Sequence, residues 1–575
     1  METEISILFP KIEGIKYKQM SSVSFHDLGL DSICEAISND TREQGMIMSV
    51  LTTMCDDPAV ASYRSEVFED MLNIPSLRNQ MTDLLKRIRT LKDFGIMRKE
   101  VGKQAGLWDL MHRIEEISEY ITCVEEIRDC LNNNNVKSQG LKDLKAYVEA
   151  VYSNSSFDSM KKDISELKAT TKSIQSVTIG INLNPRFEAK SIGLISVNDT
   201  PFVNSGIVSN LSRALSSKDQ LNEGNEWNGD MHFSQVGRSE NLPFKNMQSL
   251  AGFMTMASNP FTTSQMRQTL INVPNQDSGT ESFPYYVNQL ATNLLNITAR
   301  KLKDILVNYM TVSVVSIANL IPEFMYYIHC AEFVEKLRSK GYKLCRAQAI
   351  VDKDFTMKAV GAYNIKLITN SSENSESIVP NDLDFSDEHT VYILTGANRG
   401  GKTTFTQAIG QLFALAQGGI PVPAESFTYA PVDCIYTHFP ADEDKTMDLG
   451  RLGEECQRFK ELFTNCTSSS LLLLNETFST TSFEEGYYIA KDSVRAILAR
   501  KIRTIYNTHM HKIARDIDEL NSSVDSKAKA ASLIVKTDGG KRSFEIVVAK
   551  PEGQSYANDI ASKYGVTYDQ LTKSN

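Results

Sequence analysis

Apolar residues recur at helical spacing through about the first 155 residues, a stretch rich in Leu, Ile, Lys and Glu and poor in Gly and Pro. The clearest run covers residues 76–103, where the apolar positions are Leu77, Met81, Leu84, Leu85, Ile88 and Leu91. The basic positions between them are Lys86, Arg87, Arg89 and Lys92. We interpret these as a solvated helix face, favoured about four to one over a face that contacts nucleic acid. The pattern predicts a helical segment over residues 1–155.

The pattern changes twice in the middle of the chain. A second helical run begins at residue 156 and gives way to a β-prone piece over residues 176–183. Residues 217–285 are rich in Asn, Ser, Gln, Met and Gly and contain four prolines, which predicts an insertion or a partly disordered loop. This insertion holds four basic and seven acidic residues, which gives it a net charge of −3. We therefore do not expect it to bind the phosphates of a nucleic acid electrostatically.

Helical spacing returns over residues 286–345, with an apolar face formed by Leu302, Ile305, Leu306, Tyr309, Met310, Val314 and Ile317. The helical blocks on the two sides of the insertion can pair as long antiparallel arms. Over residues 346–575, strand-like and helix-like runs alternate, as expected of an α/β domain. The pattern therefore predicts a mainly α N-terminal region followed by a C-terminal α/β domain.

The amino-acid composition indicates a globular protein but does not identify its binding partner. The 575 residues are 41% hydrophobic and 23% charged, which is ordinary for a globular protein. The net charge of −10 disfavours binding of DNA through bulk charge. Any binding to nucleic acid would therefore need local basic surfaces or a clamped geometry.

The sequence does not predict membrane insertion, secretion or a zinc site. It contains no run of about 20 uncharged apolar residues, and its acidic N-terminus lacks a signal-peptide pattern. The nine cysteines are scattered singly without a Cys-x-x-Cys pair, and the eight histidines are dispersed. We therefore expect a cytoplasmic protein with reduced thiols and no membrane partner.

One segment of the α/β region carries the strongest chemical signal. It satisfies the pattern G-x-x-x-x-G-K-[ST] and consists of Gly396, Ala397, Asn398, Arg399, Gly400, Gly401, Lys402 and Thr403. An apolar, strand-like run precedes it, and a helical run that opens with Thr404 follows it. In this context backbone N–H groups surround the phosphates of a nucleotide, while the helix N-terminus adds its positive dipole end. We expect ATP to bind here, with Lys402 at the β- and γ-phosphates and Thr403 on Mg²⁺.

Two later segments fit the same site. Four leucines over 471–474 predict a buried strand that ends in Asn475 and Glu476, although four leucines also suit a buried helix. A polar and an acidic residue at a strand end can supply a metal partner and a carboxylate that activates water. Residues 503–507 predict another strand, with His509 just beyond its end. A role for His509 in sensing the γ-phosphate is favoured about two to one over a structural role.

Together these segments resemble the MutS family of mismatch-repair ATPases. The similar segments are 395–405, which includes Asn398 at the family's phosphate-contacting position, 418–424, Thr508–His509, 544–548 and 553–557. Their spacing agrees over about 200 residues. A weaker similarity to the family's core and lever helices occurs before residue 345, for example over 63–70.

The resemblance assigns a part of the family's architecture to each region. Residues 1–155 form the first half of the helical core and lever, and residues 156–285 form a lever- or clamp-like segment with the insertion. Residues 286–345 form the second lever helices, and residues 346–575 form an ABC-type P-loop ATPase domain. It implies Glu476 and His509 as catalytic residues, Thr403 and Asn475 as metal partners, and residues 396–404 as the ATP-binding loop.

The chain also departs from the family at three places. Asn475 stands where the family usually has Asp, which removes one charge near Mg²⁺. Residues 450–452 read Gly-Arg-Leu where the family's segment that reaches the partner's ATP begins Ser-Thr-Phe, while Glu455 matches the family's Glu. Nothing before residue 30 resembles the family's mismatch-reading domain, and no nuclease-like extension is expected after the ATPase domain.

The resemblance implies a homodimer that uses ATP binding and hydrolysis to open and close around mismatched or structured DNA, in mismatch repair or recombination. Among DNA substrates, branched or structured DNA is the preferred hypothesis. One alternative is an ATP-switched protein-interaction ATPase that does not depend on DNA, which the acidic net charge favours. Another is an ABC-type ATPase with longer helical arms, but the chain lacks the sustained heptads of such arms.

Overall fold

The computed structural model describes most of the chain outside its middle segment. The described residues are 5–95, 107–171, 176–183, 185, 189–198, 305, 320–352, 356–369, 378–386, 388–396, 399–440, 450–538, 541–550 and 564–572. The predicted insertion over 217–285 lies outside them. Contacts divide the chain into two compact units, the first made of Met1–Lys86, Glu126–Glu149 and Val315–Asn575 and the second of Arg87–Glu125 and Ala150–Val314. The four-part division expected from the sequence stays a prediction.

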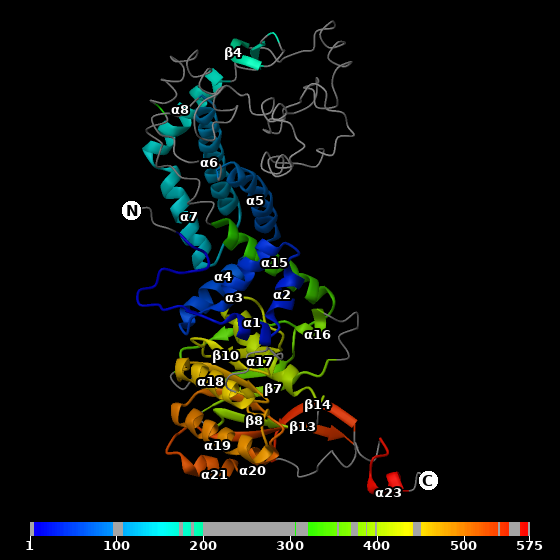
Figure 1. The fold of residues 1–575 in the computed structure, drawn as a ribbon. Helices are drawn as coiled ribbons and strands as arrows, with labels where there is room; N and C mark the ends of the chain where they lie inside the picture. Colours follow the sequence, from blue (N-terminus) through cyan, green and yellow to red (C-terminus); the bar gives the residue numbers. More distant parts are fainter. Residues whose placement is uncertain are drawn as a thin grey trace. The chain divides into compact units, whose positions relative to one another are not determined.

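The predicted helical N-terminal region is confirmed (Figure 1). Its helices are α1 (Ser22–Asp27), α2 (Leu30–Ile37), α3 (Thr41–Thr52), α4 (Pro58–Asn73), α5 (Pro75–Gly95), α6 (Leu107–Asn133), α7 (Gln139–Tyr152) and α8 (Ser155–Thr171). Local signals explain where helices begin: the Asp57 carboxylate accepts from the backbone N–H of Ala59 and Pro58 occupies the first helical position of α4. A short antiparallel pair joins β1 (Lys18–Gln19) and β2 (Thr53–Met54).

Helix α15 (Leu320–Ser339) returns the chain to the first unit and packs against α2, α3 and α4. Its buried face includes Tyr326 and Tyr327, and the Glu323 carboxylate at its start accepts hydrogen bonds from the N-terminal segment at Ser6 and Ile7. Burial raises the pKa of Glu323, and these hydrogen bonds act in the opposite direction. Residues 6 and 7 are therefore hydrogen-bonded to a helix more than 300 positions later in the chain.

In the second unit, β3 (Ser176–Leu183) pairs antiparallel with β4 (Ala189–Asn198), so the β-prone piece predicted over 176–183 is a strand. Helix α8 is joined to α6 by two ion pairs. The Lys161 ammonium lies 3.2 Å from a Glu125 carboxylate oxygen, and the Lys168 ammonium lies 2.7 Å from that of Glu115. These partly exposed pairs add little stability, but they mark the helix faces that meet.

The predicted α/β region is built on a six-stranded sheet in the order β10, β11, β12, β8, β13, β14. The strands are β10 (Ile435–His438), β11 (Leu471–Asn475), β12 (Arg503–Asn507), β8 (Val391–Thr395), β13 (Ala530–Asp538) and β14 (Lys541–Val548). The first five are parallel and β14 is antiparallel. A parallel sheet is covered on both faces, which explains the continuous apolar run of β11.

The alternation of side chains along β11 shows which helices cover each face. Leu472 and Leu474 belong to a core formed with α19 (Phe483–Arg500), α20 (His511–Arg515) and α21 (Ile517–Ser523). Leu473 faces the opposite way, toward α17 (Lys402–Gln417), where it lies close to Gly410. Helix α18 (Gly450–Asn465) packs on β10. The sheet is thus the middle layer of a three-layer domain.

A second sheet of four strands adjoins α17 and has the order β5 (Gln348–Ala349), β9 (Ser426–Tyr429), β6 (Met357–Ala362), β7 (Asn381–Phe385). Phe427 and Tyr429 of β9 pack against Phe413 of α17, with ring centroids 5.6 Å apart in both pairs. Two short helices, α16 (Lys366–Thr369) and α23 (Tyr568–Thr572), complete the described elements. Among the described residues, no helix is long and apolar enough to cross a membrane.

Candidate functional site

The glycine-rich segment connects the end of β8 to the start of α17, which is the strand–loop–helix order that the sequence predicts. Among the loop residues that the structure describes, three have positive φ: Gly396 (146°), Arg399 (60°) and Gly401 (89°). Glycine is required at Gly396 for space as well, because a Cβ there would lie 2.9 Å from the Val535 side chain. Ala397 and Asn398 lie outside the described residues. The described part has the tight backbone curvature that lets N–H groups converge on an anion.

Lys402 begins α17 and turns its side chain back toward the loop. The side chain is buried, and Nζ donates to the carbonyl oxygen of Gly396 at 3.0 Å. Burial lowers the pKa of the Lys402 ammonium, while the charge of Glu476 acts in the opposite direction. Thr404 follows in the first turn of α17, where its carbonyl oxygen accepts from Asn364 Nδ2 at 2.9 Å. A buried cation at the mouth of such a loop suits a strongly anionic ligand.

Thr403 meets the ends of two neighbouring strands. Its hydroxyl lies 3.1 Å from Oδ1 of Asn475 at the end of β11, and 3.3 Å from Nδ2 of Asn507 at the end of β12. The parallel register places Asn475 opposite Asn507, and Asn507 Nδ2 also donates to Asn475 Oδ1. Asn507 Oδ1 is buried, with no hydrogen-bond partner among the described residues. The structure thus brings together Thr403 and Asn475, the two predicted metal partners.

Asn507 was not assigned a role from the sequence. A signal for Asn507 is present in the sequence, because it ends a predicted strand as Asn475 does. Polar ends of adjacent parallel strands meet at one edge of a sheet. The sequence could not show that β11 and β12 are neighbours. That adjacency, and the matched register, make Asn507 the residue that orients the Asn475 amide.

Glu476 and His509 form a second pair beside this cluster. The Nε2 atom of His509 lies 2.7 Å from Oε1 of Glu476, and it is the donor because a carboxylate only accepts. This hydrogen bond is the largest cause of the lowered pKa of Glu476, and the charges of His509 and Lys402 act in the same direction. Glu476 has a φ of 53° and its N–H donates to the carbonyl oxygen of Asn507 at 2.8 Å. A non-glycine residue held in this conformation is typical of functional sites.

The donor atoms at this edge fit a magnesium ion that is held mainly through phosphates. The Thr403 hydroxyl and the Asn475 amide oxygen are neutral oxygen donors, and Glu476 is the carboxylate beside them. Mg²⁺ prefers oxygen ligands, keeps several waters, and is often bound through few protein groups plus substrate phosphates. The described part of the chain has no cluster of three or more His, Cys, Asp or Glu residues that could hold a metal.

Restoring a charge at residue 475 is a direct test of its place near the metal. We expect Asn475→Asp to lower the Mg²⁺ concentration for half-maximal ATP hydrolysis, because hard cations favour charged oxygen ligands. The effect should be modest, about two- to five-fold, if the contact runs through water. A magnesium titration of ATP hydrolysis measures it.

The matched control for that titration is Asn465→Asp, which adds the same charge at the exposed end of α18. Asn465→Asp should leave the titration curve unchanged. If Asn475→Asp and the wild-type chain give superimposable curves, residue 475 does not act on the metal.

The segment proposed to reach a partner's nucleotide lies at the start of α18, which begins at Gly450. Glu455, one turn later, accepts a hydrogen bond from the Thr480 hydroxyl at 2.6 Å, and its carbonyl oxygen lies 3.3 Å from Nε2 of His438. His438 also bonds Thr477, next to Glu476, and burial lowers its pKa to about 4. The first turns of α18 are therefore connected to the segment that follows the catalytic candidate. A contact made in trans by residues 450–452 stays a prediction.

A glycine-rich loop between a buried parallel strand and a helix, facing polar strand ends, defines a P-loop ATPase domain. Comparison with known protein families identifies the family to which this domain belongs. Residues 392–571 match the family profile MutS domain V, and residues 56–340 match MutS2 N-terminal domain. The chain belongs to the MutS family, and its C-terminal part is a MutS domain V ATPase domain, which implies ATP as the nucleotide.

Individual relatives are distant and share only part of the chain. A DNA mismatch repair protein MutS of Chlorobium chlorochromatii (strain CaD3) is 31% identical over 199 residues, which cover 34% of this chain and 22% of that protein. A DNA mismatch repair protein MutS 2 of Halobacterium salinarum is 26% identical over 260 residues, 42% of this chain and 30% of that protein. The matches thus span roughly a fifth to a third of the relatives' length.

Proposed function

We propose that this chain is an ATP-dependent DNA-binding protein of the MutS type, acting in mismatch repair or recombination. ATP binding and hydrolysis would open and close a dimer around mismatched or branched DNA. The observation that carries the proposal is the geometry around Thr403, where Asn475, Glu476 and His509 gather beside the P-loop. The relatives carry the name DNA mismatch repair protein, which supports the part of the proposal that concerns DNA.

Each residue of the site has a role in this proposal. The backbone N–H groups of residues 396–404 hold the phosphates, and Lys402 supplies the positive charge that offsets them. Thr403 and Asn475 would hold Mg²⁺, which would supply positive charge against the phosphates. Glu476 accepts a proton from the attacking water at its carboxylate, and His509 orients that carboxylate through the 2.7 Å contact and responds to the γ-phosphate.

Closure of a homodimer would bring the start of α18 from one subunit to the nucleotide of the other. The contacts of Glu455 with Thr480 and of His438 with Thr477 support this, because they connect α18 to the strand end that carries Glu476. These contacts therefore couple a conformational change at the nucleotide to the start of α18, which lies in the proposed dimer surface. We place the protein in the cytoplasm, in keeping with its nine free cysteines.

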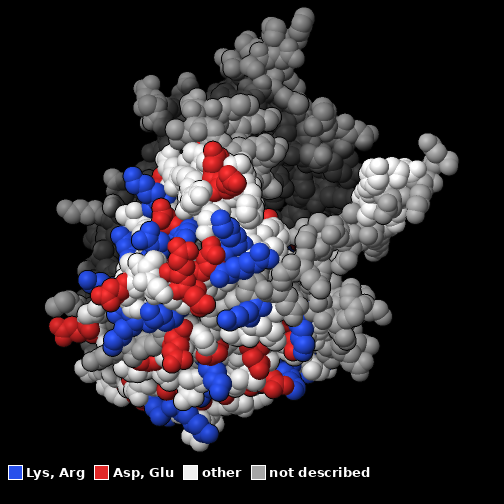
Figure 2. Space-filling view, turned by 90° about the horizontal axis from the view of Figure 1, so that it is seen from below, with Lys and Arg blue, Asp and Glu red and all other residues white. Residues whose placement is uncertain are grey.

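The charge distribution favours DNA contacts that are local. The net charge is −10, and Figure 2 shows Lys and Arg interspersed with Asp and Glu over one face of the described surface. Such a mixed surface attracts DNA weakly at long range. We therefore propose that DNA is enclosed by the helical regions of a dimer, with a limited number of phosphate contacts.

The alternative function is an ATP-switched ATPase that binds another protein without DNA, and the acidic net charge favours it. Salt dependence separates the two. If DNA is the partner, affinity for a branched duplex should fall at least about ten-fold between 50 and 200 mM salt, because each phosphate contact releases counterions. Fluorescence anisotropy with labelled branched, mismatched and fully paired duplexes measures this.

An unrelated polyanion, heparin, serves as the control for nonspecific charge binding in that experiment. Preference for the branched duplex over the paired duplex at equal salt supports the proposal. Absence of DNA binding at 50 mM salt, with and without ATP, would contradict the DNA function and leave the ATPase domain with a protein partner.

A further inference from the structure

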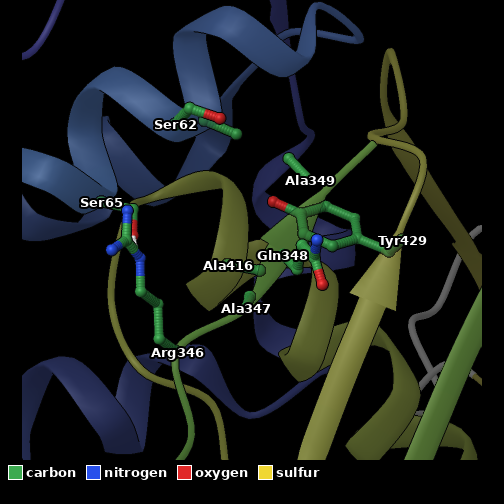
Figure 3. Close-up of a pocket in the computed structure, with 9 residues that line it drawn as sticks. Ser62, Ser65, Arg346, Ala347, Gln348, Ala349, Ala416 and Tyr429 are labelled. Carbon is green, nitrogen blue, oxygen red and sulfur yellow. Dashed lines mark hydrogen bonds between the residues drawn. The ribbon is translucent and has the colours of Figure 1, made fainter. Parts of the chain in front are cut away.

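A pocket lies in the first unit, away from the P-loop, where α4, β5, β9 and the last turn of α17 meet. Its volume is about 370 Å³, within the range of sites for small molecules. Figure 3 shows the residues that line it: Ala61, Ser62, Ser65, Arg346, Ala347, Gln348, Ala349, Ala416 and Tyr429. Sequence segments separated by nearly 370 positions therefore form one concave surface.

The lining of this pocket, which we call the α4–β9 pocket, combines four alanines with polar side chains and carries one formal charge. Arg346 supplies that charge, and none of the nine lining residues is acidic. Arg346 Nε donates to the Ser65 hydroxyl at 3.0 Å, which fixes the guanidinium at the pocket wall. A guanidinium has five N–H donors, so its two Nη nitrogens retain a planar fork suited to an oxyanion.

Tyr429 closes the other side of the pocket. The residue is 1% exposed, and its hydroxyl has no hydrogen-bond partner among the described residues. In Figure 3 the hydroxyl is directed toward the space beside Ser62 and Ala349. Burial raises the pKa of Tyr429, so the hydroxyl stays protonated and is a donor. A buried hydroxyl without a partner is costly, and a native structure normally gives it one.

We propose that the α4–β9 pocket binds a small molecule through an oxyanion, either a carboxylate or a phosphate group. Arg346 provides the charge and the planar fork, and Ser62 and Gln348 supply polar groups around the rest of the ligand. The Tyr429 hydroxyl is buried behind the pocket wall and becomes a second donor when the bound ligand shifts that wall. The positive charge of Arg346, with no acidic residue among the nine lining residues, disfavours a cationic ligand. This site is separate from the nucleotide site, which lies at the opposite end of α17.

The test is isothermal titration calorimetry of the full chain saturated with a non-hydrolysable ATP analogue, which fills the γ-phosphate position as well, so that the P-loop does not take up the probe. Inorganic phosphate is the probe in one arm and succinate in the other, which distinguishes the two sources of the oxyanion. At least one probe should bind. Arg346→Ala should weaken its binding about ten-fold or more, as loss of a charge-assisted hydrogen bond predicts. Lys358→Ala, an exposed cation on the same sheet, is the matched control and should change nothing.

Tyr429→Phe separates a ligand-binding role from a structural one. It removes only the hydroxyl that lacks a partner, so the melting temperature should stay equal or rise while affinity for the probe falls. A lower melting temperature with unchanged affinity would show that the hydroxyl serves folding and would overturn its part in the site. Failure of both probes to bind, or equal binding by the wild-type chain and Arg346→Ala, would overturn the proposal.

Discussion

Replacement of Lys402 by alanine should remove most of the affinity for ATP. The ammonium is buried at the start of α17, close to the Gly396 carbonyl oxygen, where the triphosphate would lie. A charge-assisted hydrogen bond contributes roughly 1.5–3 kcal/mol, and more when it is removed from water. That energy corresponds to a loss of at least about ten-fold in affinity. Isothermal titration with ATP, in the presence of Mg²⁺, measures it.

The alanine variant is expected to fold, which makes the result interpretable. Burial lowers the pKa of Lys402, which shows that the charged ammonium destabilises the folded chain when no anion is bound. Removing the ammonium therefore should not lower the free energy of unfolding. Lys460→Ala on the exposed side of α18 removes the same charge outside the site and should bind ATP normally. A folded Lys402→Ala chain with unchanged ATP affinity would show that the P-loop assignment is wrong.

Much of the ATPase domain was predictable because its signals are local. The glycine-rich pattern, the apolar strand before it and the helix after it lie within about 25 consecutive residues, and the structure confirms strand β8 and helix α17. The leucines of β11 were correctly predicted as a strand rather than a helix. A continuous buried run of four leucines that ends in polar residues is typical of a strand in a parallel sheet.

The remaining features depend on contacts between distant segments. Nothing local shows that β8 lies between β12 and β13, or that Asn507 bonds Asn475. The α4–β9 pocket is another such feature, since residues 61–65 and 346–349 become neighbours only when α4 packs beside β5. The roles predicted for Ala397 and Asn398 fall outside the described residues. The local sequence pattern therefore predicts the helices and strands. The order of the strands in the sheet determines which side chains of the site come into contact.

Replacement of Glu476 by glutamine should preserve ATP binding and nearly abolish hydrolysis. The hydrogen bond from His509 lowers the pKa of Glu476, so its carboxylate is ionised near neutral pH and able to accept a proton from water. Glutamine keeps the size and the hydrogen-bonding oxygen but cannot accept that proton. General-base catalysis typically contributes about 10²- to 10⁴-fold, which sets the expected loss in the rate of hydrolysis.

Because binding survives while turnover stops, the Glu476→Gln chain should accumulate with ATP bound. If closure of a dimer follows ATP binding, size-exclusion chromatography with light scattering should show a larger dimer fraction with ATP than for the wild-type chain. Glu484→Gln, on the exposed first turn of α19, is the matched control and should hydrolyse ATP at the wild-type rate.

The central claim is that this chain hydrolyses ATP at the edge of the sheet where Glu476 and His509 meet the P-loop. Its most direct test is the rate of phosphate release by the wild-type and Glu476→Gln chains at saturating ATP and Mg²⁺, with ATP binding measured on the same samples. We expect release by the wild-type chain and a loss of about 100-fold or more in the variant, with ATP affinity within about two-fold. Equal rates of phosphate release would contradict the claim and place the catalytic base elsewhere.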